Sequence, residues 1–77
     1  MKVRVRVFGH LRRFLPENRE DLVMEIPEGT SVKQFTASRS IPDDEIWVVT
    51  INGKNADEDA VLSDGDELCL FSPVGGG

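Results

Sequence analysis

The chain has only one cysteine, Cys69, and one histidine, His10, among its 77 residues. A single cysteine excludes an internal disulfide and a thiolate cluster for zinc or iron–sulfur. Cys69 lies between two leucines in an expected strand, so we interpret it as a small buried hydrophobe, with a reactive thiol as the alternative. With no second histidine to pair with it, His10 is interpreted as a loop side chain.

Long apolar segments are missing as well. No run approaches the roughly 20 residues that a membrane-spanning helix needs. Met1 and Lys2 lead into alternating valine and arginine instead of a signal peptide. We therefore expect a cytoplasmic protein with no membrane partner. No Ser/His/Asp set, metal-ligand cluster or phosphate loop is present, so we expect neither a free-standing enzyme, a metal site nor a stably bound cofactor.

Acidic residues outnumber basic residues by 14 to 9, which gives a net charge of −5. This sign argues against nucleic acid as a partner. The charges are unevenly distributed: basic residues crowd into positions 1–13, and acidic residues into positions 57–67. Because the acidic half leads into the C-terminus, we expect a partner that receives this end to offer a basic rim.

Alternating or apolar segments predict strands at residues 2–7, 21–26, 46–51, 54–56 and 67–71. The first is the most regular, with three valines on one face and Lys2, Arg4 and Arg6 on the other. Leu11, Phe14 and Leu15 anchor the loop after it. Asn52 and Gly53 predict a tight turn between two strands.

One short helix is expected. Ser31 and Gln34 have the spacing of a capping box, which predicts a helix from there to about Arg39. The element order indicates a β-grasp fold of the α+β class: a mixed sheet of four to five strands, with the helix across one face and the first and last strands parallel at the centre. We expect a domain over residues 1–71 and a flexible tail over residues 72–77.

The chain ends in Ser-Pro-Val-Gly-Gly-Gly. Glycine has no Cβ, so such a tail can pass through a narrow channel and present the Gly77 carboxylate to another protein. An inert, frayed end is the alternative. We favour the functional interpretation because the last strand leads directly into the tail and Pro73 stiffens its base.

The last strand also predicts a docking patch. Leu68 and Leu70 share one face, which we assign to the core, and Cys69 and Phe71 share the other. Phe71, next to Pro73 and Val74, would then be exposed at the base of the tail. The alternative is that Phe71 folds back under the loop that carries Val61.

Four segments together resemble the MoaD/ThiS family of ubiquitin-like sulfur carriers: residues 5–12, 27–32, 49–53 and 62–77. The most specific match is the Asp-Gly-Asp turn followed by Phe-x-Pro-Val and a terminal Gly-Gly. The Phe-x-Pro-Val form is closest to the small subunit of molybdopterin synthase. The chain departs from the family at Ser72, where a first proline is common, and at the additional Gly75.

The resemblance implies a ubiquitin-like fold and a role as a protein substrate. A ubiquitin-activating-type enzyme would adenylate Gly77 with ATP, and a sulfur donor protein would convert it to a thiocarboxylate, with Gly76 leaving room for the reagents. The large subunit of molybdopterin synthase would be a further partner in molybdenum or tungsten cofactor biosynthesis. Residues implied in partner contacts are Phe71, Pro73, Val74 and Gly75.

Three other functions remain open. The chain would act as the sulfur carrier for the thiamin thiazole, or as a ubiquitin-like modifier conjugated to lysines through Gly77. It would otherwise be a β-grasp interaction domain with an inert tail, for which removal of Gly76 and Gly77 changes nothing.

Overall fold

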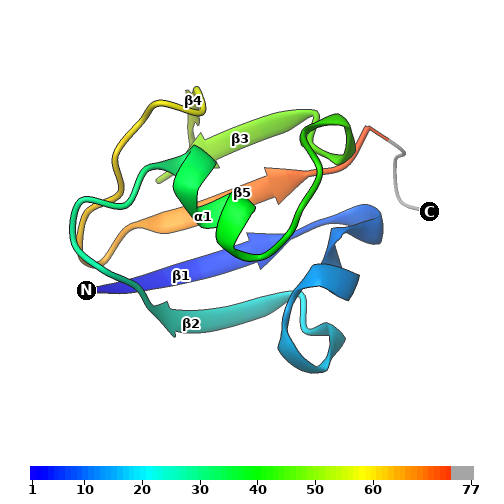
Figure 1. Cartoon of the computed structure of the whole chain (residues 1–77), viewed down its shortest axis with the longest axis horizontal. Helices are drawn as coiled ribbons and strands as arrows, with labels where there is room; N and C mark the ends of the chain where they lie inside the picture. The colour runs from blue at the N-terminus through cyan, green and yellow to red at the C-terminus, as the bar shows by residue number, and fades with distance from the viewer. Residues whose placement is uncertain (74–77) are drawn as a thin grey trace.

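The computed structural model describes residues 1–73. Five strands form one sheet in the order β2-β1-β5-β3-β4 (Figure 1). They are β1 (Lys2–Val7), β2 (Asp21–Glu25), β3 (Val48–Ile51), β4 (Lys54–Ala56) and β5 (Glu67–Phe71). β1 and β5 pair in parallel, and the other neighbours pair antiparallel. The expected parallel pair of first and last strands, with β5 at the centre of the sheet, is therefore confirmed.

The core lies on one face of this sheet. The register places Val5 opposite Leu68 and Val7 opposite Leu70, and Val49 lies on the other side of Leu70. Val5, Leu68 and Leu70 are fully buried. The valines that alternate with arginines in β1 thus bury their side chains, as the period of two predicts.

The helix α1 (Val32–Ser38) covers the core face (Figure 1). It begins with the expected capping box, in which the Ser31 hydroxyl accepts from the Gln34 amide (3.1 Å) and the Gln34 side chain accepts from the Ser31 amide (3.0 Å). These two bonds satisfy backbone donors that the first turn leaves unpaired. Val32 and Phe35 pack into the core, so even this short helix closes one face of the sheet.

The predicted turn at Asn52 and Gly53 joins β3 to β4. Both residues have positive φ, 54° and 83°, as a two-residue type I′ hairpin turn requires. The Asn52 side chain adds two contacts to the start of β5, because its amide oxygen accepts from the Glu67 amide (2.9 Å) and its nitrogen donates to Asp66 (2.9 Å). The turn therefore also holds the entry to the central strand.

Two segments differ from the sequence-based expectation. The loop after β1 contains two 3₁₀ helices, η1 (Gly9–Phe14) and η2 (Pro16–Asn18), with Leu11 and Leu15 buried as anchors. The predicted strand 46–51 begins only at Val48, because its partner β5 ends opposite that residue, at Phe71. The residues before it instead follow a third 3₁₀ helix, η3 (Asp43–Glu45), and Trp47 is left 71% exposed.

Candidate functional site

The sheet face opposite α1 carries the outward side chains of β1, β5 and β3. We call it the open face, since no helix within residues 1–73 lies over it (Figure 1). The pairing places Arg4 beside Glu67, Arg6 beside Cys69, and Val48 beside Phe71. Charged and apolar side chains therefore lie at opposite ends of the same strands, with the apolar end where β5 leads into residues 72–77.

Two phenylalanines form an aromatic patch at that end. Phe8 follows β1 and continues its pairing, because its amide donates to the Leu70 carbonyl (3.0 Å). Its ring stacks on the ring of Phe71 with a centroid separation of 4.6 Å and an interplanar angle of 3°. Phe8 is 37% exposed and Phe71 is half-buried. Together with Val48, which pairs with Phe71, these residues give a continuous apolar surface, and the stacking of the two rings stabilises it.

The charged border of the patch comes from β1. The Arg6 guanidinium lies 5.8 Å from the centre of the Phe8 ring, within the range of a cation–π contact. It also lies 3.8 Å from Asp21 and 3.9 Å from Glu67. Arg6 thus links the aromatic patch to the ion pairs on the remainder of the open face.

The strongest of these ion pairs joins β1 to β2. Two nitrogens of Arg4 donate to the two carboxylate oxygens of Asp21, at 3.0 and 2.7 Å. The hydrogen bond from Arg4 lowers the pKa of Asp21, and the same bond raises the pKa of Arg4. Because the carboxylate is bound in its charged form, the folded state favours deprotonated Asp21.

We expect Asp21→Asn to reduce stability at neutral pH and to have no effect in acid. The folded pKa of Asp21 lies below the unfolded value of about 3.9, so its contribution is complete above that value and is lost as the pH falls through the folded pKa. Urea unfolding of the unchanged protein and of the variant, from acid to neutral pH, measures the difference in their free energies of unfolding. This difference is small because the pair is exposed. A constant difference at every pH would contradict the assignment.

Cys69 lies in β5, between Arg6 of β1 and Thr50 of β3 in the register. It is a free thiol with 8% exposure. Its interpretation as a small buried hydrophobe is therefore confirmed, because the neighbouring strands cover it although it faces outward.

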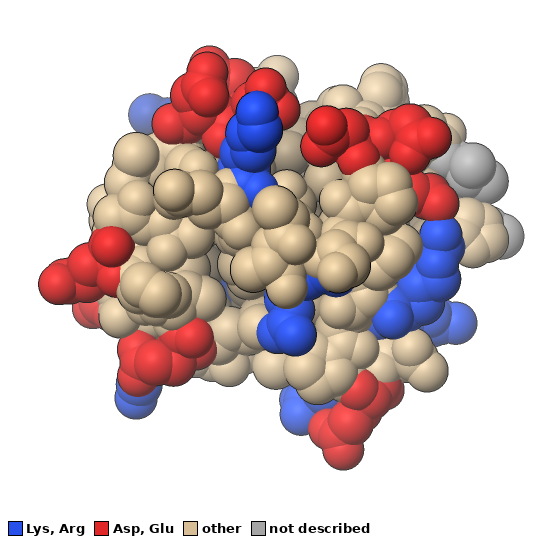
Figure 2. Space-filling view, viewed as in Figure 1, with Lys and Arg blue, Asp and Glu red and all other residues tan. Residues whose placement is uncertain are grey.

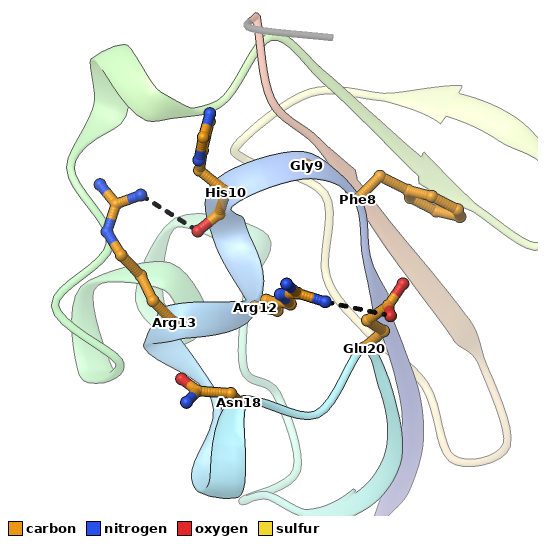
Figure 3. Close-up of a pocket in the computed structure, with 7 residues that line it drawn as sticks. All are labelled: Phe8, Gly9, His10, Arg12, Arg13, Asn18 and Glu20. Atoms are coloured by element: carbon orange, nitrogen blue, oxygen red, sulfur yellow. Dashed lines mark hydrogen bonds and ion pairs between the residues drawn. The ribbon is translucent and has the colours of Figure 1, made fainter. Parts of the chain in front are cut away.

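A groove of about 680 Å³ lies beside the aromatic patch, where η1 and η2 meet the end of β1 (Figure 3). Phe8, His10, Arg12 and Arg13 are among its lining residues. Figure 3 shows Arg12 directed toward Glu20 (3.5 Å) and Arg13 toward the His10 carbonyl (3.1 Å). Arg13 also pairs with Glu45 of η3 (2.6 Å). Both arginine side chains remain about half exposed.

The charge around the end of β5 therefore differs from the sequence-based expectation. Asp64, Asp66 and Glu67 precede the tail in sequence, but they lie at the start of β5, at the opposite end of the strand from Phe71. The parallel pairing instead brings η1, with Arg12 and Arg13, to the end that carries Phe71 (Figure 1). A partner that covers the aromatic patch from the side of η1 meets Arg12 and Arg13, whereas the acidic residues of η3 precede β3 at the same end of the sheet.

The structure places two of the predicted site residues. Phe71 lies on the open face, next to Phe8, and Pro73 is exposed after the buried Ser72. Val74, Gly75, Gly76 and Gly77 lie outside the described residues. Phe8 was not predicted, although the alternation that points Arg4 and Arg6 outward, continued by one more step, places Phe8 outward too. A large apolar side chain at an outward position was the signal.

Two further observations concern residues 1–73 alone. None of the helices there is long and apolar enough to cross a membrane. No group of three or more histidine, cysteine, aspartate and glutamate side chains in this range is arranged to hold a metal ion.

Solved structures with this fold include subunits of molybdopterin converting factors and an archaeal modifier protein. A Pyrococcus furiosus protein assigned as molybdopterin converting factor subunit 1 is 25% identical, with a TM-score of 0.71 over 96% of this chain and 99% of that chain. Subunit 1 of the Helicobacter pylori factor, solved in complex with subunit 2, is 24% identical, with a TM-score of 0.63 and full coverage of both chains. The small archaeal modifier protein 1 of Haloferax volcanii is 20% identical, with a TM-score of 0.70 over 95% and 98%.

These likenesses confirm the ubiquitin-like β-grasp fold. No curated protein matches the chain. The family model described as the ThiS family matches residues 5–77, which include all five strands except the first three residues of β1. The chain therefore belongs to the ThiS family.

Proposed function

We propose that this protein is a sulfur carrier, whose C-terminal Gly77 is adenylated, converted to a thiocarboxylate and used as the sulfur source for a pterin precursor in molybdopterin biosynthesis. The observation that carries the proposal is the aromatic patch at the end of β5, the strand that leads into the Gly-Gly-Gly segment. An apolar docking surface at this point lets a partner hold the domain while the carboxylate occupies its active site.

The chemistry requires an activating partner. A carboxylate does not exchange oxygen for sulfur directly, because oxide is a very poor leaving group. Reaction with ATP gives an acyl-adenylate and pyrophosphate, and the leaving group becomes AMP. A persulfide sulfur then attacks the acyl carbon and releases AMP, and a thiol cleaves the remaining sulfur–sulfur bond to free the thiocarboxylate. The residues of this chain supply the reacting carboxylate and the docking surface.

The molybdopterin pathway is supported by the likeness to molybdopterin converting factor subunit 1 and by the Phe-x-Pro-Val motif at residues 71–74. By analogy with the complex of subunits 1 and 2 in Helicobacter pylori, we propose a large synthase subunit as the second partner. Membership of the ThiS family keeps the thiamin thiazole as the alternative acceptor.

A role as a protein modifier is the second candidate, favoured by the likeness in fold to the archaeal modifier protein. Adenylation of Gly77 is common to both roles. They diverge in the nucleophile that displaces AMP, which is sulfur for the carrier and a lysine amine for the modifier.

Intact-mass spectrometry tests the proposal. The protein is incubated with ATP, an adenylating enzyme and a persulfide donor, where the enzyme and the donor are encoded in the same genome. We expect a mass gain equal to the replacement of one oxygen by one sulfur, mapped to Gly77. An unchanged mass, with an enzyme that activates a related carrier in parallel, would contradict it. Adducts on the lysines of added proteins would support the modifier instead.

A further inference from the structure

A second surface with the features of a binding site lies at the β3–β4 edge and adjoins the aromatic patch at Val48. It consists of two adjoining depressions that share Val49 and Glu58. The inner cleft, of about 120 Å³, lies between α1, η3 and the loop after β4. The outer depression, of about 380 Å³, lies along the sheet edge and is bordered by Trp47. We call the two together the edge groove.

The inner cleft combines an apolar floor with two carboxylates. Val32, Ile46 and Val49 supply apolar side chains, and Asp43 and Glu58 line the same cleft. Glu45 of η3 is bound by Arg13, but neither Asp43 nor Glu58 has an ion pair within the described part of the chain. The Lys33 amide donates to the Glu58 carbonyl (2.9 Å), which ties this loop to α1, while the Glu58 carboxylate has no ion pair among residues 1–73.

Trp47 gives the outer depression a binding side chain. It is 71% exposed, whereas the strands bury most other large apolar residues. The cause is local: the Trp47 amide donates to the Phe71 carbonyl (2.7 Å), so β5 fixes the backbone, but β4 ends at Ala56, opposite Val49. Val48 and Trp47 therefore extend beyond the edge strand. Tryptophan is among the residues that most often dominate binding energies at protein interfaces.

Charge decides what fits this groove. Figure 2 shows acidic side chains gathered in two groups along the edge of the molecule where β3 and β4 lie, with one basic side chain between them. Among the acidic residues of η3 and the loop after β4 are Asp43, Asp44, Asp57, Glu58 and Asp59. A lysine or arginine has a long apolar stem and a cationic end, which matches an apolar floor between carboxylates. The cation also interacts favourably with the face of an indole ring. An anionic membrane, a nucleic acid or a second copy of this acidic chain would be repelled.

We infer that the edge groove binds a basic segment of a partner protein, which places a lysine or arginine side chain between Asp43 and Glu58 and lies against Trp47. Val48 lines the groove and also pairs with Phe71 of the aromatic patch. A partner that holds the open face can therefore extend around the edge of the sheet into the groove. This surface is separate from the chemistry at Gly77, so it can be tested without ATP or an activating enzyme.

Fluorescence gives a direct measurement, because Trp47 is the only tryptophan and the chain has no tyrosine. The probe is a short acetylated and amidated peptide of alternating lysine and threonine. We expect saturable binding with a blue shift of the Trp47 emission, weakened by added salt because the contacts are exposed. A peptide of alternating glutamate and threonine should cause no shift.

The double variant Asp43→Asn, Glu58→Gln tests the cleft. We expect about a tenfold loss of affinity for the basic peptide, the sum of two exposed charge contacts. The matched control is Glu17→Gln, Glu28→Gln, which removes the same charge at exposed positions that do not line the groove. NMR chemical shifts of backbone amides give a second measurement that does not depend on Trp47. We expect the amide shifts of Ile46 and Val49 to change when the basic peptide is added.

Three results would overturn the inference. One is an equal loss of affinity in the control variant, which would show binding to net charge alone. Another is peptide binding that leaves the Trp47 emission and the Val49 amide unchanged, which would place the site elsewhere. The third is a Trp47 emission shift that depends on protein concentration without peptide, which would assign the groove to a second copy of the chain. None of them bears on whether Gly77 is thiocarboxylated.

Discussion

A chain that ends at Gly76 should not be thiocarboxylated at all, while its thermal unfolding stays the same. The core consists of residues that precede Ser72, so removal of the last residue takes away no buried contact within the described residues. The reaction, in contrast, needs the acyl carbon at a fixed distance from the docking surface. Shortening the segment by one residue withdraws it by about 3.3–3.6 Å, a displacement large enough to abolish attack on ATP.

Two further forms separate the requirements for length, space and charge. Gly77→Ala keeps the length but adds a side chain beside the acyl carbon, and we expect no detectable adenylation. A form with Gly77 as a primary amide keeps both length and space but lacks the carboxylate. It should bind the activating enzyme with unchanged affinity and release no pyrophosphate. Normal adenylation of the shortened chain or of Gly77→Ala would refute the proposed role of the C-terminus.

Phe71→Ala should weaken the complex with the activating enzyme or the large synthase subunit by about 2 kcal/mol, roughly 30-fold, as is typical of a central aromatic contact. The isolated domain should lose only about 1 kcal/mol, the worth of a stacked pair on a half-exposed surface. Calorimetry of binding and urea unfolding measure the two quantities. Phe8→Ala should behave in the same way, because the two rings form one surface.

Leu70→Ala is the matched control, one residue away on the same strand. Leu70 is fully buried on the core face, so its truncation should cost about 2–5 kcal/mol of stability. Under conditions in which the Leu70→Ala variant is folded, its affinity for the partner should change little. If Phe71→Ala destabilises the protein as strongly as Leu70→Ala and leaves binding intact, Phe71 belongs to the core and the aromatic patch is not the docking surface.

The strands and the helix could be predicted because each has a local signal. The alternation at residues 2–7, the capping box at Ser31 and the turn at Asn52 and Gly53 all depend on neighbours in sequence, and the structure confirms all three. The start of β3 could not be predicted in this way. The apolar run 46–51 continues past the point where its partner strand ends, and only the pairing with β5 shows that point.

The surroundings of the candidate site depend on contacts between distant residues, which explains the errors there. Asp66 is five residues from Phe71 in sequence but lies at the other end of β5, whereas Arg12 is 59 residues away and lies at the same end. Because the first and last strands pair in parallel, residues that are distant in sequence lie at the same end of β5, whereas residues close in sequence lie at opposite ends. The outward position of Phe8 could be predicted from the alternation of β1, but its stacking on Phe71 could not, since that partner is on the last strand.

The central position of β5 also determines how the domain responds to a pull. A force applied to Pro73 along the strand acts at the same time on the hydrogen bonds to β1 and on those to β3, so that they must break together instead of one after another. A terminal strand at the edge of a sheet is hydrogen-bonded to one neighbour only, so its hydrogen bonds could break one after another. The central position of β5 therefore favours a domain that stays folded while its C-terminal end is pulled.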